Sequence, residues 1–566
     1  MTKKKWVVSK KNSKLSKTIS DKLNISPVTA QVLINRGIKS AVEAEGFLNP
    51  SLFDLPSPFL MKDMQRAVDR LKQAILENEL VAVYGDYDVD GVTGTSLLYN
   101  FLKFLDCNVI YYNPDRFKEG YGINIEAINF LNNQNVKLIV SVDCGITAVD
   151  EIEEAKKFGI DFIITDHHRP PKVLPNATAI LNPHQVGCDY PGKEIAGVSV
   201  VFNLSIALRR TLREEGFFKE SEPNLGDYLD LVALGTVADC APLLNINRIV
   251  VKEGLKRMEN PRREGLKALK QVSGIKGKVT SYDLGFKLGP RINAMGRLSS
   301  ASEAVKLFVS DQPDQVLYLA EILNEENSNR QSIEKQIMEE AINMIDSNPE
   351  LLESNSLVLS SEDWHQGVIG IVASRIVELY NKPAFLIAVD ENGVGKGSGR
   401  SVKGIDLYKI LSESSELFHN FGGHEQAAGI TINKEFIDEF RNKLSSNIDS
   451  IDRHYEIEIN IDSILDFDDL NDELVSELQI LSPYGIGNPM PTFMTESVEV
   501  LSQKVFKDKH INFKVRKSGK VFDAMWFNVS KVVDLPKNIN IAFTPEFNDW
   551  NGKKDIRLTI KDANYN

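Results

Sequence analysis

Short apolar runs alternate with helical stretches between Leu80 and Ala241, and this pattern predicts a parallel sheet. The runs LVAVY, NVIYY, KLIVSV, DFIIT and AIL are rich in β-branched and aromatic residues, and helix-like stretches such as TGTSLLYNFLKFL and EIEEAKKFG separate them. Such alternation is typical of βα units with parallel strands. Residues 224–310 carry apolar residues at helical spacing. We therefore expect an α/β domain over 61–311, after an N-terminal extension, 1–60.

Three further sections follow this domain. Residues 312–349 are charged and contain no glycine, which predicts a helical connector. Strand-like and helical runs alternate again over 350–450, as in SLVLS, AFLIAV and EFIDEFRNKL, and predict a second α/β domain. From 453 to 566 short strands and tight turns dominate. This last pattern favours a small β-barrel, with an oligonucleotide-binding (OB-like) barrel as a candidate.

Composition narrows the class of protein. The 566 residues are 42% hydrophobic, enough for several cores. The four cysteines form no C-x-x-C pair, which argues against a zinc ribbon or disulfide framework and for a cytoplasmic protein. No uncharged apolar run approaches ~20 residues, so we expect no membrane partner. The net charge of -13 weakens the case for a nucleic-acid partner without excluding it, because binding needs only a local basic groove.

An acidic cluster follows the first predicted strand. Asp86, Asp88 and Asp90 alternate along YGDYDVDG, and carboxylates this close repel one another unless protons or a cation neutralise them. A divalent metal is the simplest explanation, although an exposed acidic turn is the usual meaning of a short D-x-D. An EF-hand is excluded because its twelfth position, counted from Asp86, is Leu97 instead of glutamate. A phosphate-binding glycine loop is excluded because its lysine is absent.

Other potential metal ligands also follow apolar runs. They are Asp143 after KLIVSV, Asp166, His167 and His168 after DFIIT, and Asp239 after VALGTVA. The carboxyl ends of parallel strands meet at one edge of a sheet, so we expect the first two of these segments to converge with the Asp86–Asp90 loop. A lone histidine would more often have a structural role, but two adjacent histidines after an aspartate, near other acidic strand ends, favour metal coordination. Carboxylates with one imidazole suit Mn²⁺ or Mg²⁺ better than Zn²⁺, and we expect Cys144 and Cys240 to pack.

Together these segments resemble the four motifs of the DHH phosphoesterase superfamily, whose Asp-His-His triplet is here 166–168. The resemblance covers nearly the whole chain. It implies two metals per active site, one held by Asp88 and Asp143 and the other by Asp90, Asp143, His167 and Asp239. Two such metals activate a water for in-line attack on phosphorus.

The same resemblance assigns supporting roles to three residues. Relatives such as the pyrophosphatases have a histidine where this chain has Gly85 and Asp86. Asp86 is therefore expected to help hold the first metal, directly or through water. His168 is expected to stabilise charge near the substrate, and Asp166 to orient it.

Within the superfamily, PDRFKEGYGIN, GVSVVFNL, GFKLGPRINAMGRL, HQGVIGIVASR, GSGRS and FGGHEQAAG resemble segments of the RecJ exonucleases. The resemblance implies a 5′-to-3′ exonuclease that hydrolyses single-stranded DNA to mononucleotides in DNA repair and recombination. It also implies a monomer that works with a single-strand-binding protein and a RecQ-type helicase.

The residues that this resemblance assigns to the substrate are mostly arginines, whose planar guanidinium suits phosphate. Arg116, Ser398 and Arg400 would recognise the 5′-phosphate, and Tyr121 would stack on a base. The full set is Arg116, Tyr121, Arg291, Arg297, Arg375, Ser398, Arg400 and His424. For any single arginine a surface ion pair is an equal alternative, as is a packing role for the tyrosine.

The sequence of the barrel region does not decide between nucleic-acid binding and core packing. Lysines and arginines between 504 and 520 are interleaved with Phe506, Phe513 and Phe522, as in single-strand binding, but the phenylalanines would equally form a core. Two other functions also remain open. One is a superfamily phosphodiesterase for short oligonucleotides or cyclic dinucleotides, and the other is a non-catalytic DNA-binding relative.

Overall fold

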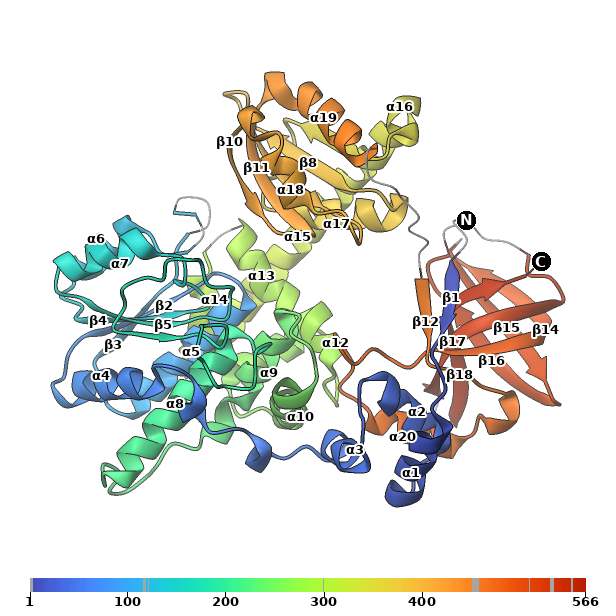
Figure 1. The fold of residues 1–566 in the computed structure, drawn as a ribbon, viewed down its shortest axis with the longest axis horizontal. Helices are drawn as coiled ribbons and strands as arrows, with labels where there is room; N and C mark the ends of the chain where they lie inside the picture. Colours follow the sequence, from blue (N-terminus) through green and yellow to red (C-terminus); the bar gives the residue numbers. More distant parts are fainter. Residues whose placement is uncertain are drawn as a thin grey trace. The chain divides into compact units, whose positions relative to one another are not determined.

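The chain folds into two compact units. The computed structural model describes residues 4–115, 119–120, 122–298, 300–449, 458–507, 509–529, 534–550 and 553–565. Unit 1 comprises Met1–Gly289, Val305–Val316 and Glu456–Asn566, and unit 2 comprises Pro290–Ala304 and Leu317–Tyr455. Unit 1 contains a parallel sheet and the C-terminal barrel, and unit 2 contains a separate mixed sheet (Figure 1).

The sheet of unit 1 has five parallel strands in the order β3-β2-β4-β5-β6, as the alternating pattern predicted. The strands are β2 (Val81–Gly85), β3 (Val109–Tyr112), β4 (Leu138–Val142), β5 (Asp161–Thr165) and β6 (Ala179–Leu181). The chain places β3 on one side of β2 and then returns to place β4 on the other. The carboxyl ends of β2 and β4 therefore flank the point where strand order reverses, which is where ligands bind in open α/β sheets.

Helices cover both faces of this sheet (Figure 1). On one face lie α6 (Ile125–Asn133) and α7 (Val149–Lys157), whose apolar residues share a core with β2, β4 and β5. On the other lie α4 (Met64–Leu76), α5 (Val89–Phe104) and α8 (Gly197–Glu214). Every residue of β2 and β4 is buried, which explains why these strands read as continuous apolar runs.

A run of helices follows the sheet. They are α9 (Leu229–Ala238), α10 (Asn245–Glu259), α11 (Glu264–Val272), α12 (Ser281–Asp283), the π-helix η4 (Leu284–Leu288), α13 (Gly289–Leu298), α14 (Ser302–Val309) and α15 (Pro313–Asp346). The long helix α15 confirms the predicted connector, and Pro313 occupies a helix start, where its missing N–H is not needed. Within the described ranges, every helix is too short or too polar to cross a bilayer.

Unit 2 is built on a second five-stranded sheet in the order β10-β11-β9-β8-β7. Its strands are β7 (Leu357–Ser361), β8 (Ala384–Val389), β9 (Val394–Arg400), β10 (Phe418–Gly423) and β11 (Ala427–Asn433). Only β7 and β8 pair in parallel, and the remaining pairs are antiparallel. The helices α17 (Ile369–Tyr380), α18 (Leu407–Ser412) and α19 (Ile437–Asp449) complete the α/β domain that the pattern predicted.

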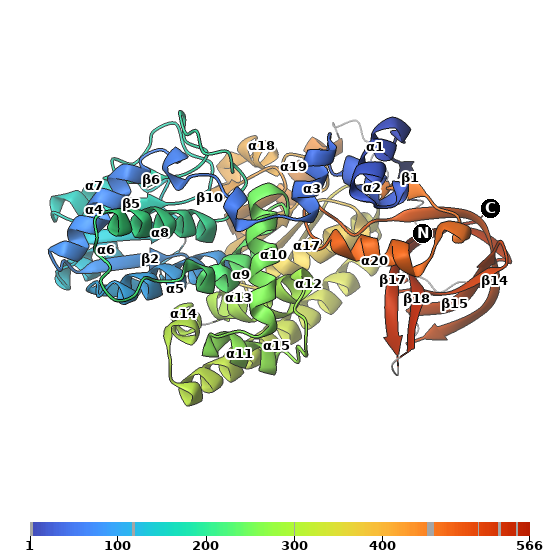
Figure 2. The same ribbon diagram turned by 90° about the horizontal axis from the view of Figure 1, so that it is seen from below.

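The C-terminal strands close into a barrel because β14 pairs with both β15 and β17 (Figure 2). The strands are β14 (Phe493–Phe506), β15 (His510–Lys517), β16 (Lys520–Trp526), β17 (Asn538–Trp550) and β18 (Lys553–Asn564). Phe513 is buried in the barrel core and Phe522 packs against that core, whereas Phe506 is exposed. Core packing therefore accounts for two of the three interleaved phenylalanines.

The N-terminal residues join this barrel region. The helices α1 (Ser13–Leu23), α2 (Pro27–Asn35) and α3 (Ala41–Leu48) share one core with α20 (Asp472–Ile480) and the barrel. The strand β1 (Lys5–Val8) pairs in parallel with β12 (Glu458–Ile461). A buried ion pair of 2.8 Å joins Arg36 to Asp462. Segments at opposite ends of the sequence thus fold as one body.

A buried arginine on α10 links three segments of unit 1. The Arg248 guanidinium is 1% exposed and donates hydrogen bonds to the carbonyls of Phe47, Leu481 and Ser482. These carbonyls lie at the carboxyl ends of α3 and α20, where the helix dipole favours a cation. Burial lowers the pKa of Arg248 to about 10, so it remains charged near neutral pH.

We expect Arg248→Met to lower the free energy of unfolding by roughly 3 kcal/mol, because it leaves several buried carbonyls without donors. Urea denaturation followed by circular dichroism measures the change. The matched control is Lys256→Met on the same helix, whose ion pair with Glu253 is exposed and should contribute under about 1 kcal/mol. Equal effects of the two variants would contradict the role given to Arg248.

Candidate active site

All the predicted metal ligands except Asp239 follow three neighbouring strands at one edge of the parallel sheet, and Asp239 follows helix α9. The chain leaves β2 at Gly85, β4 at Val142 and β5 at Thr165, and an acidic loop follows each strand. The backbone N–H of Asp86 donates to the carbonyl of Val142, and that of Asp143 to Thr165. The sheet ladder thereby continues into the loops and holds them in register.

The Asp86–Asp90 loop turns directly into α5. Asp88 is the N-cap of this helix, and its carboxylate accepts hydrogen bonds of 2.9 and 3.0 Å from the N–H groups of Asp90 and Gly91. A β-carbon at Gly91 would lie 2.5 Å from the Asp86 carbonyl oxygen. Glycine is therefore required for the helix to start so close to the loop.

Asp90 points at the start of α8. Its carboxylate accepts hydrogen bonds of 2.6 Å from Gly197 N–H and 2.9 Å from Val198 N–H, and the positive helix end favours its negative charge. A β-carbon at Gly197 would lie 2.8 Å from that of Asp143 and 3.0 Å from Oδ2 of Asp90. Only glycine lets α8 approach both carboxylates.

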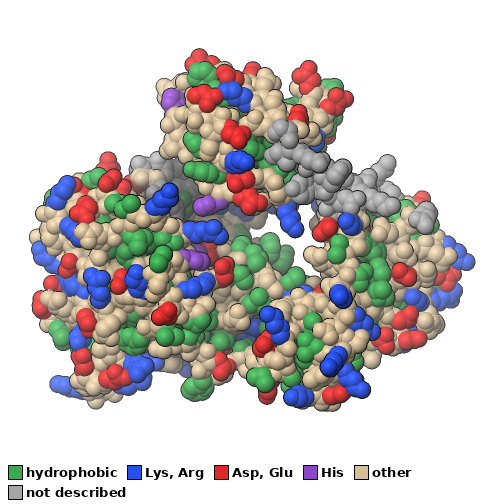
Figure 3. All heavy atoms as spheres, viewed as in Figure 1, with side chains coloured by type: hydrophobic (Ala, Val, Ile, Leu, Met, Phe, Trp, Pro, Cys, Tyr) green, Lys and Arg blue, Asp and Glu red, His purple; other side chains and the backbone are tan. Residues whose placement is uncertain are grey.

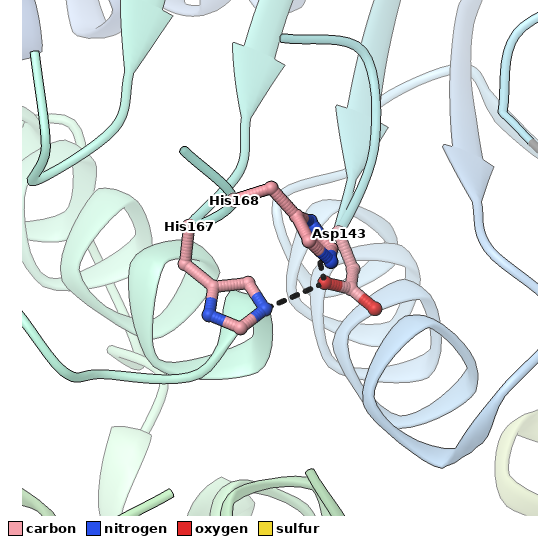
Figure 4. A group of neighbouring side chains, drawn as sticks. All are labelled: Asp143, His167 and His168. Carbon is pink, nitrogen blue, oxygen red and sulfur yellow. Dashed lines mark ion pairs between the residues drawn. The ribbon is translucent and has the colours of Figure 1, made fainter. Parts of the chain in front are cut away.

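His167 faces Asp143 across the carboxyl ends of β4 and β5 (Figure 4). The distance from His167 Nε2 to Asp143 Oδ1 is 3.1 Å, and Nε2 also lies 3.8 Å from Asp90 and 3.9 Å from Asp239. Both Nε2 and Oδ1 are buried, and neither has a hydrogen-bond partner in the part of the chain that the structure describes. Asp143 itself adopts a left-handed conformation with φ of 60°.

Three groups of these side chains have the spacing of metal ligands. In each group, the ligand atoms lie within 4.8 Å of one another. The groups are Asp86 with Asp88 and Asp143, Asp90 with His167 and Asp239, and Asp143 with His167 and His168. Asp143 therefore stands between a carboxylate group on one side and imidazoles on the other, as a bridging ligand must.

The buried carboxylates of the cluster need protons or a cation to neutralise them. Burial and the neighbouring carboxylates raise the pKa of Asp90 and of Asp143 well above the usual range. Burial and Asp88 raise the pKa of Asp239 to about 7. Burial and the nearby positive His168 lower the pKa of His167 to about 4, so its imidazole is neutral and its nitrogen can donate to a metal.

Asp166 organises the DHH triplet. Its buried carboxylate accepts hydrogen bonds from the N–H groups of Ile146, His167 and His168, and it lies 2.8 Å from His168 Nδ1. Burial opposes ionisation of both side chains, but their hydrogen bond and opposite charges lower the pKa of Asp166 and raise that of His168 to about 9. His168 is therefore a half-exposed cation beside Asp143, 3.8 Å away.

The two cysteines nearest the cluster differ from each other. Cys144 is buried, as expected, but Cys240 is exposed, so the prediction that it packs is wrong. It follows Asp239 after the end of α9 and has φ of 61°, which turns it out of the core. Among the described residues, neither cysteine joins a metal-ligand group.

Asn113 is a supporting residue that the sequence did not reveal. It follows β3, and its side-chain amide donates to the carbonyls of Gly85 and Asp86 at 3.0 and 2.9 Å. A β-carbon at Gly85 would lie 1.8 Å from Thr95 Oγ1, so no larger residue fits where some relatives carry histidine. A polar residue after the second strand was the only available signal.

A cavity of about 1080 Å³ adjoins the site within unit 1. It is lined by the residues on either side of Asp239, by α12 and η4, and by parts of α20, β17 and β18. Tyr282 and Phe286 lie on its wall, 61% and 70% exposed, with their rings stacked at 4.8 Å. The lining is mainly apolar, and its charged side chains are Lys278, Lys561 and Glu546.

In unit 2, two predicted phosphate-binding residues meet at the start of α17. The Arg400 guanidinium donates to Ser398 Oγ at 3.1 Å. A β-carbon at Gly370 would lie 2.8 Å from Ser398 Oγ and 3.2 Å from the guanidinium. Glycine thus lets a helix N-terminus, a hydroxyl and a guanidinium come together, a combination that suits a phosphate.

The other predicted substrate residues of unit 2 lie apart from this pair. Arg297 donates to the carbonyl of Gly367 at 3.0 Å, Arg291 donates to Asn324, and Arg375 pairs with Glu334. His424 is exposed in the turn between β10 and β11. Arg116 and Tyr121 lie outside the described residues.

Three segments of the chain match known domain families. Residues 80–236 match the DHH family, N-terminal domain, residues 353–450 match the DHHA1 domain, and residues 461–562 match the RecJ OB domain. These segments contain the parallel sheet, the mixed sheet and the barrel, respectively.

Whole-chain similarities agree with the domains. The chain is 37% identical to the single-stranded-DNA-specific exonuclease RecJ of Bacillus subtilis, over 99% of this chain and 71% of that protein. It is 34% identical to RecJ of Escherichia coli, over 95% of each. The crystal structure of RecJ from Thermus thermophilus in complex with Mn²⁺ matches with a TM-score of 0.86 at 29% identity, covering 99% of this chain and 80% of that one. The chain belongs to the RecJ family of single-stranded-DNA-specific exonucleases, within the DHH phosphoesterases.

Proposed function

We propose that this chain is a metal-dependent exonuclease that hydrolyses single-stranded DNA from the 5′ end, releases mononucleotides and serves DNA repair and recombination. The observation that carries the proposal is the pair of buried, unpartnered atoms 3.1 Å apart, His167 Nε2 and Asp143 Oδ1, surrounded by further carboxylates. Burying such atoms is unfavourable unless a cation lies between them.

The donor set fits two Mn²⁺ or Mg²⁺ ions. Carboxylate oxygens and one neutral imidazole are the ligands these metals prefer. Asp88 and Asp143, with Asp86 nearby, would hold one ion, and Asp143 with the group Asp90, His167 and Asp239 would hold the other. When bound, such ions lower the pKa of a water and stabilise the charge that develops on phosphoryl oxygens.

The remaining polar groups have roles of their own. His168, held as a cation by Asp166, presents a donor to a phosphoryl oxygen beside Asp143. The N–H groups at the start of α8 keep Asp90 in place. In unit 2, Ser398, Arg400 and the N-terminus of α17 would bind the terminal 5′-phosphate.

The barrel and the cavity favour a polymeric substrate over a dinucleotide. Exposed aromatic rings and lysines along one path are what sequence-tolerant single-strand binding needs, and Tyr282 and Phe286 provide such rings on the wall of the cavity. Lysines and arginines are interspersed with acidic side chains over the visible face of each unit (Figure 3). The net charge of -13 is therefore no obstacle to local contacts with phosphates.

The cellular setting is part of the same proposal. A single-strand-binding protein and a RecQ-type helicase would supply free 5′ ends, since the proposed substrate is unpaired DNA. A monomer suffices, because all proposed metal ligands come from one chain. A cytoplasmic location is supported by the four free cysteines.

Digestion of end-labelled single strands tests the function directly. With Mn²⁺ or Mg²⁺ we expect mononucleotides from the 5′ end, faster removal when that end is phosphorylated, and little action on blunt duplex. Attack from the 3′ end, or equal rates on a dinucleotide and a long strand, would contradict the proposal.

Asp143→Ala should abolish cleavage, by roughly 10³-fold or more, because it removes the ligand shared by both metals. Binding of single-stranded DNA should persist in a filter or anisotropy assay. Mn²⁺ at about 100 times its Kd should stabilise the native chain by about 2.7 kcal/mol in thermal unfolding, and this gain should shrink in the variant.

The control for this variant is Asp150→Ala, which removes an exposed carboxylate in the first turn of α7. It should retain both cleavage and the Mn²⁺-dependent rise in Tm. Normal turnover of Asp143→Ala would refute the two-metal assignment, whatever its effect on stability.

Replacing both Tyr282 and Phe286 by alanine should weaken binding of long single strands by about 1–3 kcal/mol for each lost stack. Because neither ring belongs to a metal-ligand group, kcat at saturating substrate should stay nearly unchanged. Phe53→Ala, which removes a ring that is 99% exposed elsewhere in unit 1, is the control. An unchanged affinity for long strands would exclude the cavity as part of the DNA path.

A further inference from the structure

The buried face of α15 changes character in its middle. Its buried residues recur every three or four positions, as expected for a helix packed on a core. The apolar ones include Val316, Leu319, Ala320 and Leu323 in the first half of the helix and Ile337, Ala341 and Ile345 near its end. Between these apolar ends, the same face carries Asn327, Arg330 and Glu334, which are 3%, 8% and 2% exposed.

These polar side chains form a connected network within unit 2. Arg330 donates to Asn327 Oδ1 at 3.0 Å and to Glu334 Oε2 at 2.6 Å. The other carboxylate oxygen of Glu334, Oε1, forms an ion pair of 2.6 Å with Arg375 of α17. One turn before Asn327, Asn324 accepts a hydrogen bond of 3.0 Å from Arg291. The network ends on Arg375, one of the arginines that the sequence resemblance assigns to the substrate.

Stability does not explain why this network is retained. Replacing buried ion pairs by apolar residues of similar volume is often neutral or stabilising, and the flanking positions on this helix are apolar. The network does have a geometric consequence. Glu334 is buried, whereas the Arg375 side chain is 56% exposed, so the ion pair fixes one guanidinium nitrogen of Arg375 at the buried carboxylate while much of the side chain stays exposed.

The charges of the network also leave Arg375 able to attract a phosphate. A carboxylate paired with Arg375 alone would cancel its positive charge and weaken its attraction for phosphate. Here Arg330 supplies a second cation to the same carboxylate, at 2.6 Å. The three side chains carry a net charge of +1, so Arg375 is oriented without being neutralised.

We infer that Glu334 and Arg330 are positioning residues that hold the Arg375 guanidinium for a phosphate of the DNA backbone. The inference rests on the proposed function, because it requires Arg375 to contact the strand. Guanidinium–phosphate contacts depend on orientation as well as charge, and a rigid helix provides that orientation better than a loop.

The test compares ion pairs on two faces of one helix. The double variant Arg330→Met, Glu334→Met removes the buried pair while leaving the charge of Arg375. It should raise the KM for single-stranded DNA by roughly tenfold through lost orientation, with kcat at saturation nearly unchanged. The control, Lys335→Met with Glu339→Met, removes an exposed pair with the same spacing and should leave both constants unchanged.

Combination with Arg375→Gln separates this inference from the proposed function. If Arg375 contacts DNA, Arg375→Gln alone raises KM, and adding the Arg330 and Glu334 changes raises it no further. A normal KM for Arg375→Gln would remove both the contact and the inference, while the digestion experiment above would still decide polarity. A normal KM for the double methionine variant beside an impaired Arg375→Gln would overturn the positioning role alone.

The Tm of the double methionine variant shows whether it folds. If it does not fold, the conservative variant Arg375→Lys provides the test instead. Arg375→Lys retains the charge but lacks the planar fork that Glu334 can hold while phosphate binds. It should raise KM nearly as much as Arg375→Gln. A wild-type KM for Arg375→Lys would show that charge alone suffices and would overturn the inference.

Discussion

Mutual repulsion among carboxylates at one edge of a parallel sheet is the constraint on which the rest of unit 1 depends. Asp90 and Asp143 are fully buried beside other acidic groups, and burial and these neighbours raise the pKa of both. Such a cluster persists only if the surrounding fold holds it and protons or a cation neutralise it. The fold does so with helix N-termini at Asp88 and Asp90 and with glycines where helices must come close.

The two units divide the chemistry between them. Unit 1 contributes acidic ligands and a histidine kept neutral by burial, which suits metal binding and bond cleavage. Unit 2 contributes guanidinium groups and a helix N-terminus, which suit phosphate recognition. A phosphodiester substrate needs both kinds of group, because the carboxylates that bind metal would by themselves repel its phosphates.

Much of the fold could be predicted from the sequence because the strands of the parallel sheet share one sequence pattern. Strands buried on both faces read as apolar runs, so β2, β4 and β5 and the helices between them could be predicted. The role of residues 1–60 could not be predicted, since their apolar residues pack against partners hundreds of positions away, such as Phe493 and Phe543. The exposure of Cys240 was also missed, because one left-handed residue at a helix end decides its direction.

For the site, residue types and strand ends were enough to predict that Asp86, Asp88, Asp90, Asp143 and His167 would converge, whereas Asp239, which follows helix α9, was placed with them only by the family resemblance. Carboxylates at the ends of neighbouring parallel strands can hardly avoid one another, whatever the details of packing. The supporting contacts are different in kind. The hydrogen bonds of Asn113, the approach of Gly197 and the network around Glu334 depend on which helix face meets which neighbour.

The sequence by itself determined the domain classes and the acidic, metal-binding character of the chain, since both follow from local periodicity and residue chemistry. Only the tertiary structure decided the electrostatic state of each group. His167 is neutral and His168 a cation although they are adjacent in sequence, because one is buried near a positive charge and the other is bound to Asp166. Burial and the distances between charges set these states, and both arise only when distant segments pack together.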